Sequence, residues 1–346
     1  MPNCLKCGTS LAVNEEGVAP VLCDRCAGVA TGRARRAMSL GGLGRSPVTL
    51  ALIAINVVAF ILQQVPGLNV TFWGENIGPL TLSGEYWRLF TAGFLHANIL
   101  HIGFNMWCLY SLGMLSERLF GKWQTFAIYM ITGVGGALLS IAHSPNHGEL
   151  GASGAIFGIV GAVIAGVKFG EFNISAGEKR AVVSSAVSFT VLNFALGFSG
   201  IGMFGSVDNF CHLGGLVSGL LIGLPLGAFH RKHLLQLATV VVTSAVLVVA
   251  GRELVQTRGP EAQRNLSRIA AQQGDFVWEA ELLEKYIRSN PGDEQALLDL
   301  GTAYATIGQT EKAVDSFEHV LALNPNSEEA KQALQELRGS SDLQKK

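Results

Sequence analysis

The sequence predicts an all-α polytopic membrane protein that carries a small soluble module at each end. Only 15% of its 346 residues are charged and 49% are hydrophobic, whereas a soluble domain usually has about 25% charged residues. The deficit is concentrated in residues 47–250, which contain long uncharged runs, while both ends are polar. This profile is typical of a membrane core with soluble appendages.

Seven apolar segments account for the predicted core. A helix needs roughly 17–25 apolar residues to cross the hydrocarbon layer, and each segment comes close to that length. They lie at about 47–65, 96–116, 123–142, 151–168, 181–199, 208–229 and 234–250. We expect residues 47–230 to form a six-helix core and 234–250 a seventh span. Because the chain opens with polar, cysteine-rich sequence, we expect the first apolar segment to be retained and not cleaved as a leader.

Positive charges orient these segments. Every second loop carries Lys or Arg, and the linker of residues 31–46 is also basic; the loop residues are Arg118, Lys122, Lys168, Lys179, Arg180, Arg231 and Lys232. The alternate loops carry only Arg88. The positive-inside rule therefore predicts a cytoplasmic N-terminus and outward-facing loops at 66–95, 143–150 and 200–207. With seven spans the C-terminus lies outside; if 234–250 does not span, it is cytoplasmic. The compact architecture favours a bacterial inner membrane.

Residues 1–30 contain two C-x-x-C pairs that are 15 residues apart. A structural zinc takes four soft ligands, and each pair supplies two, so we predict a closed, zinc-ribbon-like site formed by Cys4, Cys7, Cys23 and Cys26. Two disulfides are the alternative, but disulfides rarely persist in a reducing cytosol. The expected zinc is structural, and no cofactor is expected for catalysis.

The C-terminal tail repeats with a period of 34 residues. Asn290-Pro291 recurs as Asn324-Pro325, and Gly274 recurs as Gly308. A 34-residue period of paired helices resembles the tetratricopeptide repeat, whose pattern is matched by Tyr304, Gly308, Ala313, Phe317 and Pro325. We predict two such repeats and a closing helix within 262–338, with a protein partner; an ordinary helical hairpin without fixed function is the alternative.

Two motifs near the outer ends of predicted spans could carry nucleophilic chemistry. Gly151-Ala-Ser153-Gly154 opens the fourth span, and His212, followed by Gly-Gly, lies near the start of the sixth. Both spans run inward, so Ser153 and His212 should lie at a similar shallow depth. A serine needs a base to become nucleophilic, and neutral histidine is the commonest one. Small residues on both spans permit the close approach that a serine–histidine hydrogen bond requires.

A third polar motif lies at the outer end of the second span. His101 and Asn105 are four residues apart and share a helix face, with His96 just before them. A ring nitrogen and an amide can both donate to a developing oxyanion. A metal site is the alternative, but no carboxylate accompanies these residues at this depth. Asp208, four residues before His212, is expected to cap the helix and not to complete a triad.

Together these motifs resemble the rhomboid family of intramembrane serine proteases over roughly residues 47–230. The family's G-x-S-G, H-x-x-x-N and glycine-followed histidine match this chain, as do Trp87-Arg88 and Glu117-Arg118. The resemblance implies Ser153 as nucleophile and His212 as base in a dyad without a third acid. It implies oxyanion or supporting roles for His96, His101, Asn105, Gly151 and Phe157, of which Phe157 should pack on the histidine. Cys211 stands where the family more usually has alanine.

The resemblance implies an intramembrane serine endopeptidase. Its substrates would be single transmembrane helices, cut near small residues with helix-breaking residues beyond the cut. The main alternative is an inactive relative that binds or escorts membrane proteins. A transporter or channel is disfavoured because acidic residues are nearly absent from the spans. No nucleic-acid partner is expected.

Overall fold

The computed structural model describes residues 9–10, 46–170, 172, 174–198, 207–229 and 231–344. The predicted zinc ligands Cys4, Cys7, Cys23 and Cys26, and the basic linker up to residue 45, lie outside the described residues.

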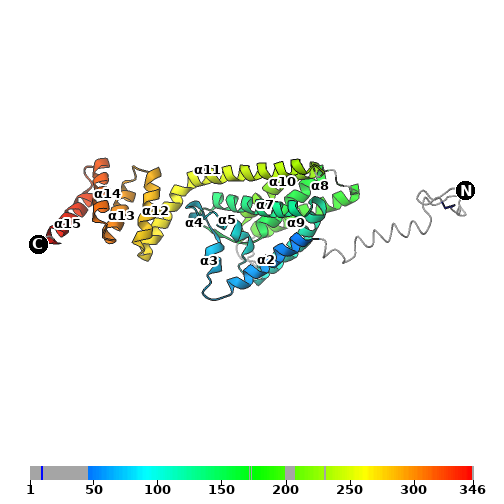
Figure 1. The fold of residues 1–346 in the computed structure, drawn as a ribbon, viewed down its shortest axis with the longest axis horizontal. Helices are drawn as coiled ribbons and strands as arrows, with labels where there is room; N and C mark the ends of the chain where they lie inside the picture. The colour runs from blue at the N-terminus through cyan, green and yellow to red at the C-terminus, as the bar shows by residue number, and fades with distance from the viewer. Residues whose placement is uncertain are drawn as a thin grey trace.

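In the part of the chain that the structure describes, seven apolar helices form the bundle, close to the predicted segments (Figure 1). They are α2 (Pro47–Gln63), α6 (Ile99–Phe120), α7 (Lys122–His143), α8 (Ser153–Phe169), α9 (Ala176–Phe198), α10 (Asn209–Ala228) and α11 (His233–Gln273). Five of the described helices, α6, α7, α9, α10 and α11, are long and apolar enough to cross a membrane. The other two, α2 and α8, have 17 residues each, the lower limit for a span.

Helix α8 forms the centre of the bundle. Nearly every residue from Gly154 to Val167 is buried, including Ile156, Ile159 and Val163 in the main hydrophobic core. Around it pack α6, α7, α9 and α10. A helix that is apolar on all sides is a buried helix, so the uniform hydrophobicity of α8 accounts for its central place. Its first residue is Ser153.

Glycines bring α8 and α10 into backbone contact. A Cβ atom at Gly215 would overlap the Gly154 carbonyl, and one at Gly219 would overlap the Gly158 carbonyl. Close helix approach through small residues is the usual packing of membrane helices. These glycines therefore set the distance between the helix that begins with Ser153 and the helix that carries the predicted base.

The connection from α2 to α6 is folded and not an open loop. It contains α3 (Val70–Gly74), β1 (Asn76–Ile77), α4 (Gly78–Leu82), α5 (Arg88–Thr91) and the short 3-10 helix η2 (Ala92–Phe94). Strand β1 pairs antiparallel with β2 (Gly148–Glu149), which lies in the connection between α7 and α8; Asn76 is opposite Glu149. This two-stranded ribbon joins the α2–α6 connection, called the first connection below, to the segment that leads into α8.

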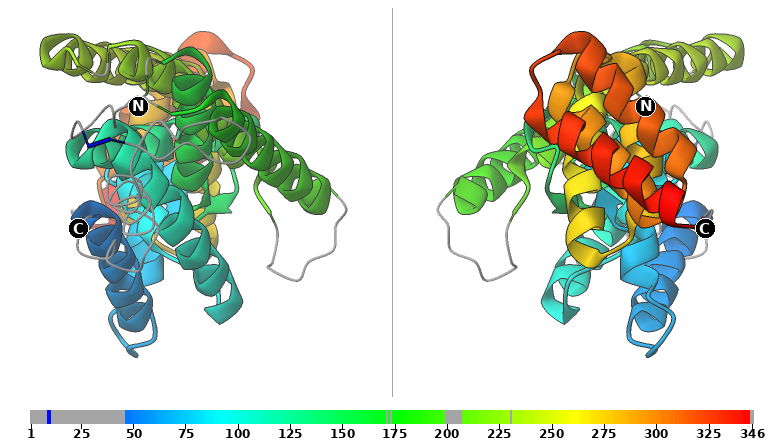
Figure 2. Two further views of the ribbon diagram at one scale, coloured as in Figure 1. Left: turned by 90° about the vertical axis from the view of Figure 1, so that its right-hand side faces the viewer. Right: turned by 90° about the vertical axis from the view of Figure 1, so that its left-hand side faces the viewer.

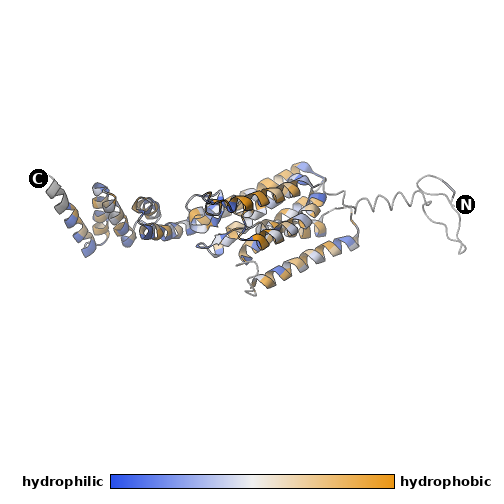
Figure 3. Cartoon of the chain, turned by 90° about the horizontal axis from the view of Figure 1, so that it is seen from below, coloured by the Kyte–Doolittle hydropathy of each residue, from blue (hydrophilic) through white to orange (hydrophobic). Residues whose placement is uncertain are grey.

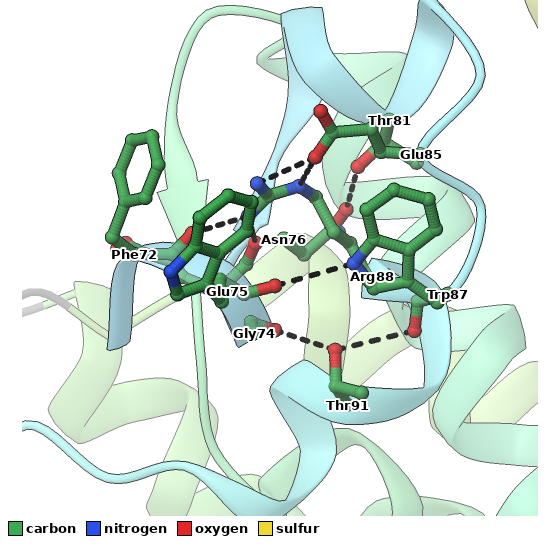
Figure 4. Close-up of polar contacts among 10 residues, drawn as sticks. Phe72, Gly74, Glu75, Asn76, Thr81, Glu85, Trp87, Arg88 and Thr91 are labelled. Atoms are coloured by element: carbon green, nitrogen blue, oxygen red, sulfur yellow. Dashed lines mark hydrogen bonds and ion pairs between the residues drawn. The ribbon is translucent and has the colours of Figure 1, made fainter. Parts of the chain in front are cut away.

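Arg88 holds the first connection together (Figure 4). Its buried guanidinium donates to the carbonyls of Phe72 (2.6 Å) and Glu75 (2.8 Å) and pairs with the Glu85 carboxylate (2.6 Å). A buried cation needs such partners, because removing it from water is costly. The Trp87-Arg88 pair noted in the sequence thus has a structural role. In the same way, Glu117 caps the start of α2, where its carboxylate accepts from the Val48 and Thr49 N–H groups.

Helix α11 continues well beyond the predicted seventh span. It runs unbroken for 41 residues, through Pro260, into the first repeat. Its second half packs on α4 and on the end of α7, where Leu82, Ile141 and Ala262 form a buried cluster. Asn265 Nδ2 also donates to Asn146 Oδ1 at 3.3 Å. The repeats therefore lie beyond the end of the bundle that carries α4 and the α7–α8 connection (Figures 1 and 2).

The C-terminal repeats are helical, as predicted. Beyond α11 come α12 (Phe276–Ser289), α13 (Glu294–Thr306), α14 (Thr310–Leu323) and α15 (Glu328–Gln344). Gly274 and Gly308 take equivalent left-handed turns, with φ of +75° and +77°, which glycine adopts without steric cost. Polar residues dominate these helices, whereas apolar residues dominate the bundle (Figure 3). The 34-residue period thus corresponds to two helix pairs, the end of α11 with α12 and α13 with α14. The closing helix is α15.

Candidate active site

Ser153 is the first residue of α8, and Ala152 is the N-cap. Its side chain is partly exposed, while Ala152 and Gly154 on either side are buried. The first N–H groups of a helix have no acceptor within the helix. Gly154, the next residue, packs against the Cys211 sulfur. The Ser153 N–H is thus a candidate donor to an oxyanion formed beside its own hydroxyl.

His212 lies in the first turn of α10 and is only 7% exposed. Its ring stacks on Phe157 with a centroid separation of 4.3 Å and an interplanar angle of 18°. Phe157 is one helical turn after Ser153. On the preceding residue of α10, Cys211 packs against Gly154. The structure therefore brings the serine turn of α8 against the histidine turn of α10.

Asp208 caps α10, as predicted. Its Oδ1 accepts from the Phe210 and Cys211 N–H groups at 2.9 Å each, and its Oδ2 accepts the Ser140 hydroxyl. His212 Nδ1, by contrast, has no hydrogen-bond partner within the described ranges. Among the described residues, no carboxyl is therefore hydrogen-bonded to that ring nitrogen.

His101 faces the glycine that precedes the serine. Its Nδ1 accepts from the Ala97 N–H at 3.4 Å, which leaves the hydrogen of a neutral ring on Nε2. A Cβ at Gly151 would lie 3.0 Å from that Nε2 and 3.8 Å from Ser153 Oγ. Gly151 has a φ of +136°, a conformation that favours glycine. Both the space and the backbone angle therefore favour glycine here, and His101 Nε2 and Ser153 Oγ both lie within 4 Å of the same point at Gly151.

Asn105 and His96 both lie next to His101. The Asn105 amide is buried and donates to the His101 carbonyl of its own helix at 3.1 Å. An amide nitrogen has two hydrogens, so one remains for a substrate. His96 was predicted inside the second span, but α6 begins only at Ile99. The buried His96 ring packs edge-to-face on the His101 ring, with a centroid separation of 5.0 Å, so it supports His101.

Comparisons with known proteins identify the domains. A family model described as "Rhomboid domain" matches residues 83–229, and one described as "Tetratricopeptide repeat" matches 270–337. Residues 83–229 form a rhomboid domain. The matched segment contains Ser153, His212, His101 and Asn105. Although the match begins at residue 83, α2 packs into the same core through Leu52.

Named relatives of this rhomboid domain include bacterial and plant proteins. Rhomboid protease GluP of Bacillus subtilis is 26% identical over 294 residues, which are 82% of this chain and 55% of the relative. RHOMBOID-like protein 1 of Arabidopsis thaliana is 33% identical over 56% of this chain and 55% of its own length. Rhomboid protease AarA of Providencia stuartii is 29% identical over 60% of this chain and 82% of the relative. The chain thus spans about half the length of the first two relatives.

The rhomboid domain and the long apolar helices make this an integral membrane protein. Within the described residues, no group of three His, Cys, Asp or Glu side chains is placed to hold a metal. One polar group near the site was missed in the sequence. Glu149 is buried four residues before Ser153 and accepts from Cys211. A lone carboxylate in a short connection between two spans was the signal that could have drawn attention to it.

Proposed function

We propose that the chain is an intramembrane serine endopeptidase that hydrolyses peptide bonds in or next to transmembrane helices. The observation that carries the proposal is the junction of α8 and α10. There Ser153 begins one helix, and His212 stacks on Phe157 one turn further along that same helix. Two relatives are themselves named rhomboid proteases. A nucleophile beside a base, with donors nearby, is the arrangement needed for acyl transfer.

The proposed reaction uses His212 as the base. Its Nδ1 is buried, so we assign Nε2 as the nitrogen that takes the Ser153 proton. The serine oxygen then attacks the scissile carbonyl, and the oxyanion is stabilised by the Ser153 N–H, His101 Nε2–H and the remaining Asn105 N–H. His212 gives its proton to the leaving amine, which leaves an acyl-enzyme. Water, deprotonated by His212, releases the acid and restores the serine.

A helical substrate must unwind before this reaction, because its carbonyl groups are already hydrogen-bonded inside the helix. Ser153 and His212 lie at the ends of α8 and α10 and not at their middles. That position favours access to both residues for water and for an unwound segment of the substrate. We therefore propose transmembrane-helix proteins as substrates, cut near the membrane surface.

A fluorophosphonate probe tests the assignment of the nucleophile. Such a probe phosphonylates an activated serine, so we expect one adduct on the peptide that contains Ser153, and none in Ser153→Ala. Ser111, on α6 away from the site, provides the matched control, and Ser111→Ala should label as the wild type does. An escort protein without activity would leave the wild-type chain unlabelled, and that result would remove the proposal.

For topology we propose a cytoplasmic N-terminus in a bacterial inner membrane, with the repeats outside. The loop charges support this orientation. So does the packing of α11 on α4, which puts the repeats at the end of the bundle where Ser153 and His212 lie. We further propose that Cys4, Cys7, Cys23 and Cys26 bind a structural zinc on the cytoplasmic side. The repeats would bind a protein partner outside.

Cysteine labelling in intact cells tests the orientation. Gln309 is exposed at the start of α14, and Lys122 is exposed at the start of α7. A membrane-impermeant maleimide should modify Gln309→Cys above the parent background and leave Lys122→Cys unmodified until the cells are opened. The reverse pattern would place the repeats in the cytoplasm.

A further inference from the structure

Glu149 is a buried carboxyl that the proposed reaction does not use. It lies in β2, in the connection between α7 and α8, four residues before Ser153. Its side chain is almost fully enclosed. Burying a carboxyl is costly unless hydrogen bonds compensate. Its contacts therefore indicate what this residue does.

The Glu149 carboxyl joins two separate parts of the fold. The Cys211 thiol of α10 donates to Oε1 at 3.3 Å, and the Asn76 amide of β1 donates to Oε2 at 3.3 Å. The Asn76 amide oxygen in turn accepts the Thr81 hydroxyl of α4 at 2.8 Å. One side chain thus connects the folded first connection to the start of the helix that carries His212.

Cys211 extends this link to both members of the dyad. Its sulfur lies in a slot between α7 and α8, where a Cβ at Gly154 would come within 2.7 Å of it and a Cβ at Gly136 within 3.0 Å. Cys211 immediately precedes His212, and Gly154 immediately follows Ser153. The thiol therefore lies between the backbone of the nucleophile and the backbone of the base. Its hydrogen bond to Glu149 holds it in this position.

We infer that Glu149 is a positioning residue that, through Cys211, fixes the distance between the serine turn of α8 and the histidine turn of α10. The inference rests on the proposed protease function. Ser153 and Glu149 belong to one short segment, so a shift of the carboxyl would also shift Gly151, which faces His101. Reaction rates fall steeply when reacting groups are misplaced by as little as 1 Å.

The charge of Glu149 should modulate this anchor. Burial raises the pKa of Glu149, the nearby carboxylates of Asp208 and Glu75 add to the rise, and the bonds from Cys211 and Asn76 oppose it, so the pKa is about 7. The acid is therefore neutral below pH 7 and becomes ionised above it. Ionisation strengthens the bonds from the Cys211 thiol and the Asn76 amide, because a carboxylate is a stronger acceptor than a neutral acid, so the anchor tightens as pH rises through about 7.

The raised pKa of Glu149 also makes the stability of the folded chain depend on pH. The native chain keeps a proton on Glu149 that the unfolded chain loses, between the ordinary pKa of 4.5 and the native value of about 7. Stability therefore falls as pH rises across this window and stays level above it.

Three variants test the inference, with kcat and KM measured on a transmembrane-helix substrate from about pH 5.5 to about pH 9. Glu149→Gln keeps the shape and cannot ionise, so it should lose the rise in kcat that the wild type shows as pH passes upward through about 7. Glu149→Ala removes the anchor and should lower kcat about ten- to a hundredfold at every pH with little change in KM. Glu178→Gln, an exposed carboxylate at the start of α9, should match the wild type throughout.

Each possible result of these measurements either supports or overturns the inference. A Glu149→Gln variant that keeps the wild-type rise in kcat near pH 7 would overturn the inference, and so would a folded Glu149→Ala variant with wild-type kcat. Thermal unfolding shows whether Glu149→Ala is folded; if it is not, the pH profile of Glu149→Gln decides alone. A wild-type chain that neither cleaves nor takes up the fluorophosphonate would contradict the proposed function itself, which is a different result from active variants that match an active wild type.

Discussion

His212→Ala is expected to lower the rate of substrate cleavage by about a thousandfold or more, and Ser153→Ala by at least as much. The two residues act as one unit, because the serine is a weak nucleophile until the imidazole takes its proton. The double variant should therefore be no slower than Ser153→Ala alone. Purified protein reconstituted with a transmembrane-helix substrate provides the measurement.

Asp208→Asn is the matched control for this experiment. Asparagine caps a helix about as well as aspartate, so the bonds to the Phe210 and Cys211 N–H groups can persist. We expect a loss of less than about tenfold, because a cap contributes stability and not proton transfer. A loss as large as that of His212→Ala would indicate a triad in place of the dyad.

Gly215→Val is expected to have the second largest effect, because it separates the two helices that carry the dyad. Any Cβ at this position overlaps the Gly154 carbonyl, and a backbone atom cannot rotate away as a side chain can. Overpacking typically costs about 1–3 kcal/mol, and we expect a value near the upper end here. Thermal unfolding and cleavage, measured on the same preparation, should both decline.

Gly103 provides the comparison for this substitution. It lies in α6, and a Cβ there would meet nothing within 4 Å. Gly103→Val should therefore keep both the unfolding temperature and the activity close to wild type. If Gly215→Val also behaves like wild type, the close approach of α8 and α10 is not what positions Ser153 and His212.

The sequence was sufficient for the parts of the fold that depend on local pattern. Uncharged runs of a set length predict membrane helices whatever their neighbours are, and the 34-residue period is visible along the chain. The ends of the helices were less certain. The predicted seventh span proved to be the first half of α11, because nothing in residues 251–261 breaks the helix except Pro260, which the structure accommodates.

The candidate site was predictable only in part, because some of its contacts depend on how segments far apart in the sequence pack. Ser153 and His212 are each marked by neighbouring glycines, and Asp208 could be assigned as a cap from its place before a helix. The contact of Glu149 with Cys211 joins residues 62 positions apart and depends on how α7, α8 and α10 pack. The bond from Asn105 to the His101 carbonyl also had to be seen in the structure.

The central claim is that Ser153 becomes covalently acylated during peptide-bond cleavage. Reconstituted wild-type protein can be mixed with a transmembrane-helix substrate, quenched in acid and digested for mass spectrometry. The account predicts that the peptide containing Ser153 gains the mass of the N-terminal substrate fragment, through an ester that is absent from Ser153→Ala. Cleavage that proceeds in Ser153→Ala, or an acyl group found only on another residue, would contradict it.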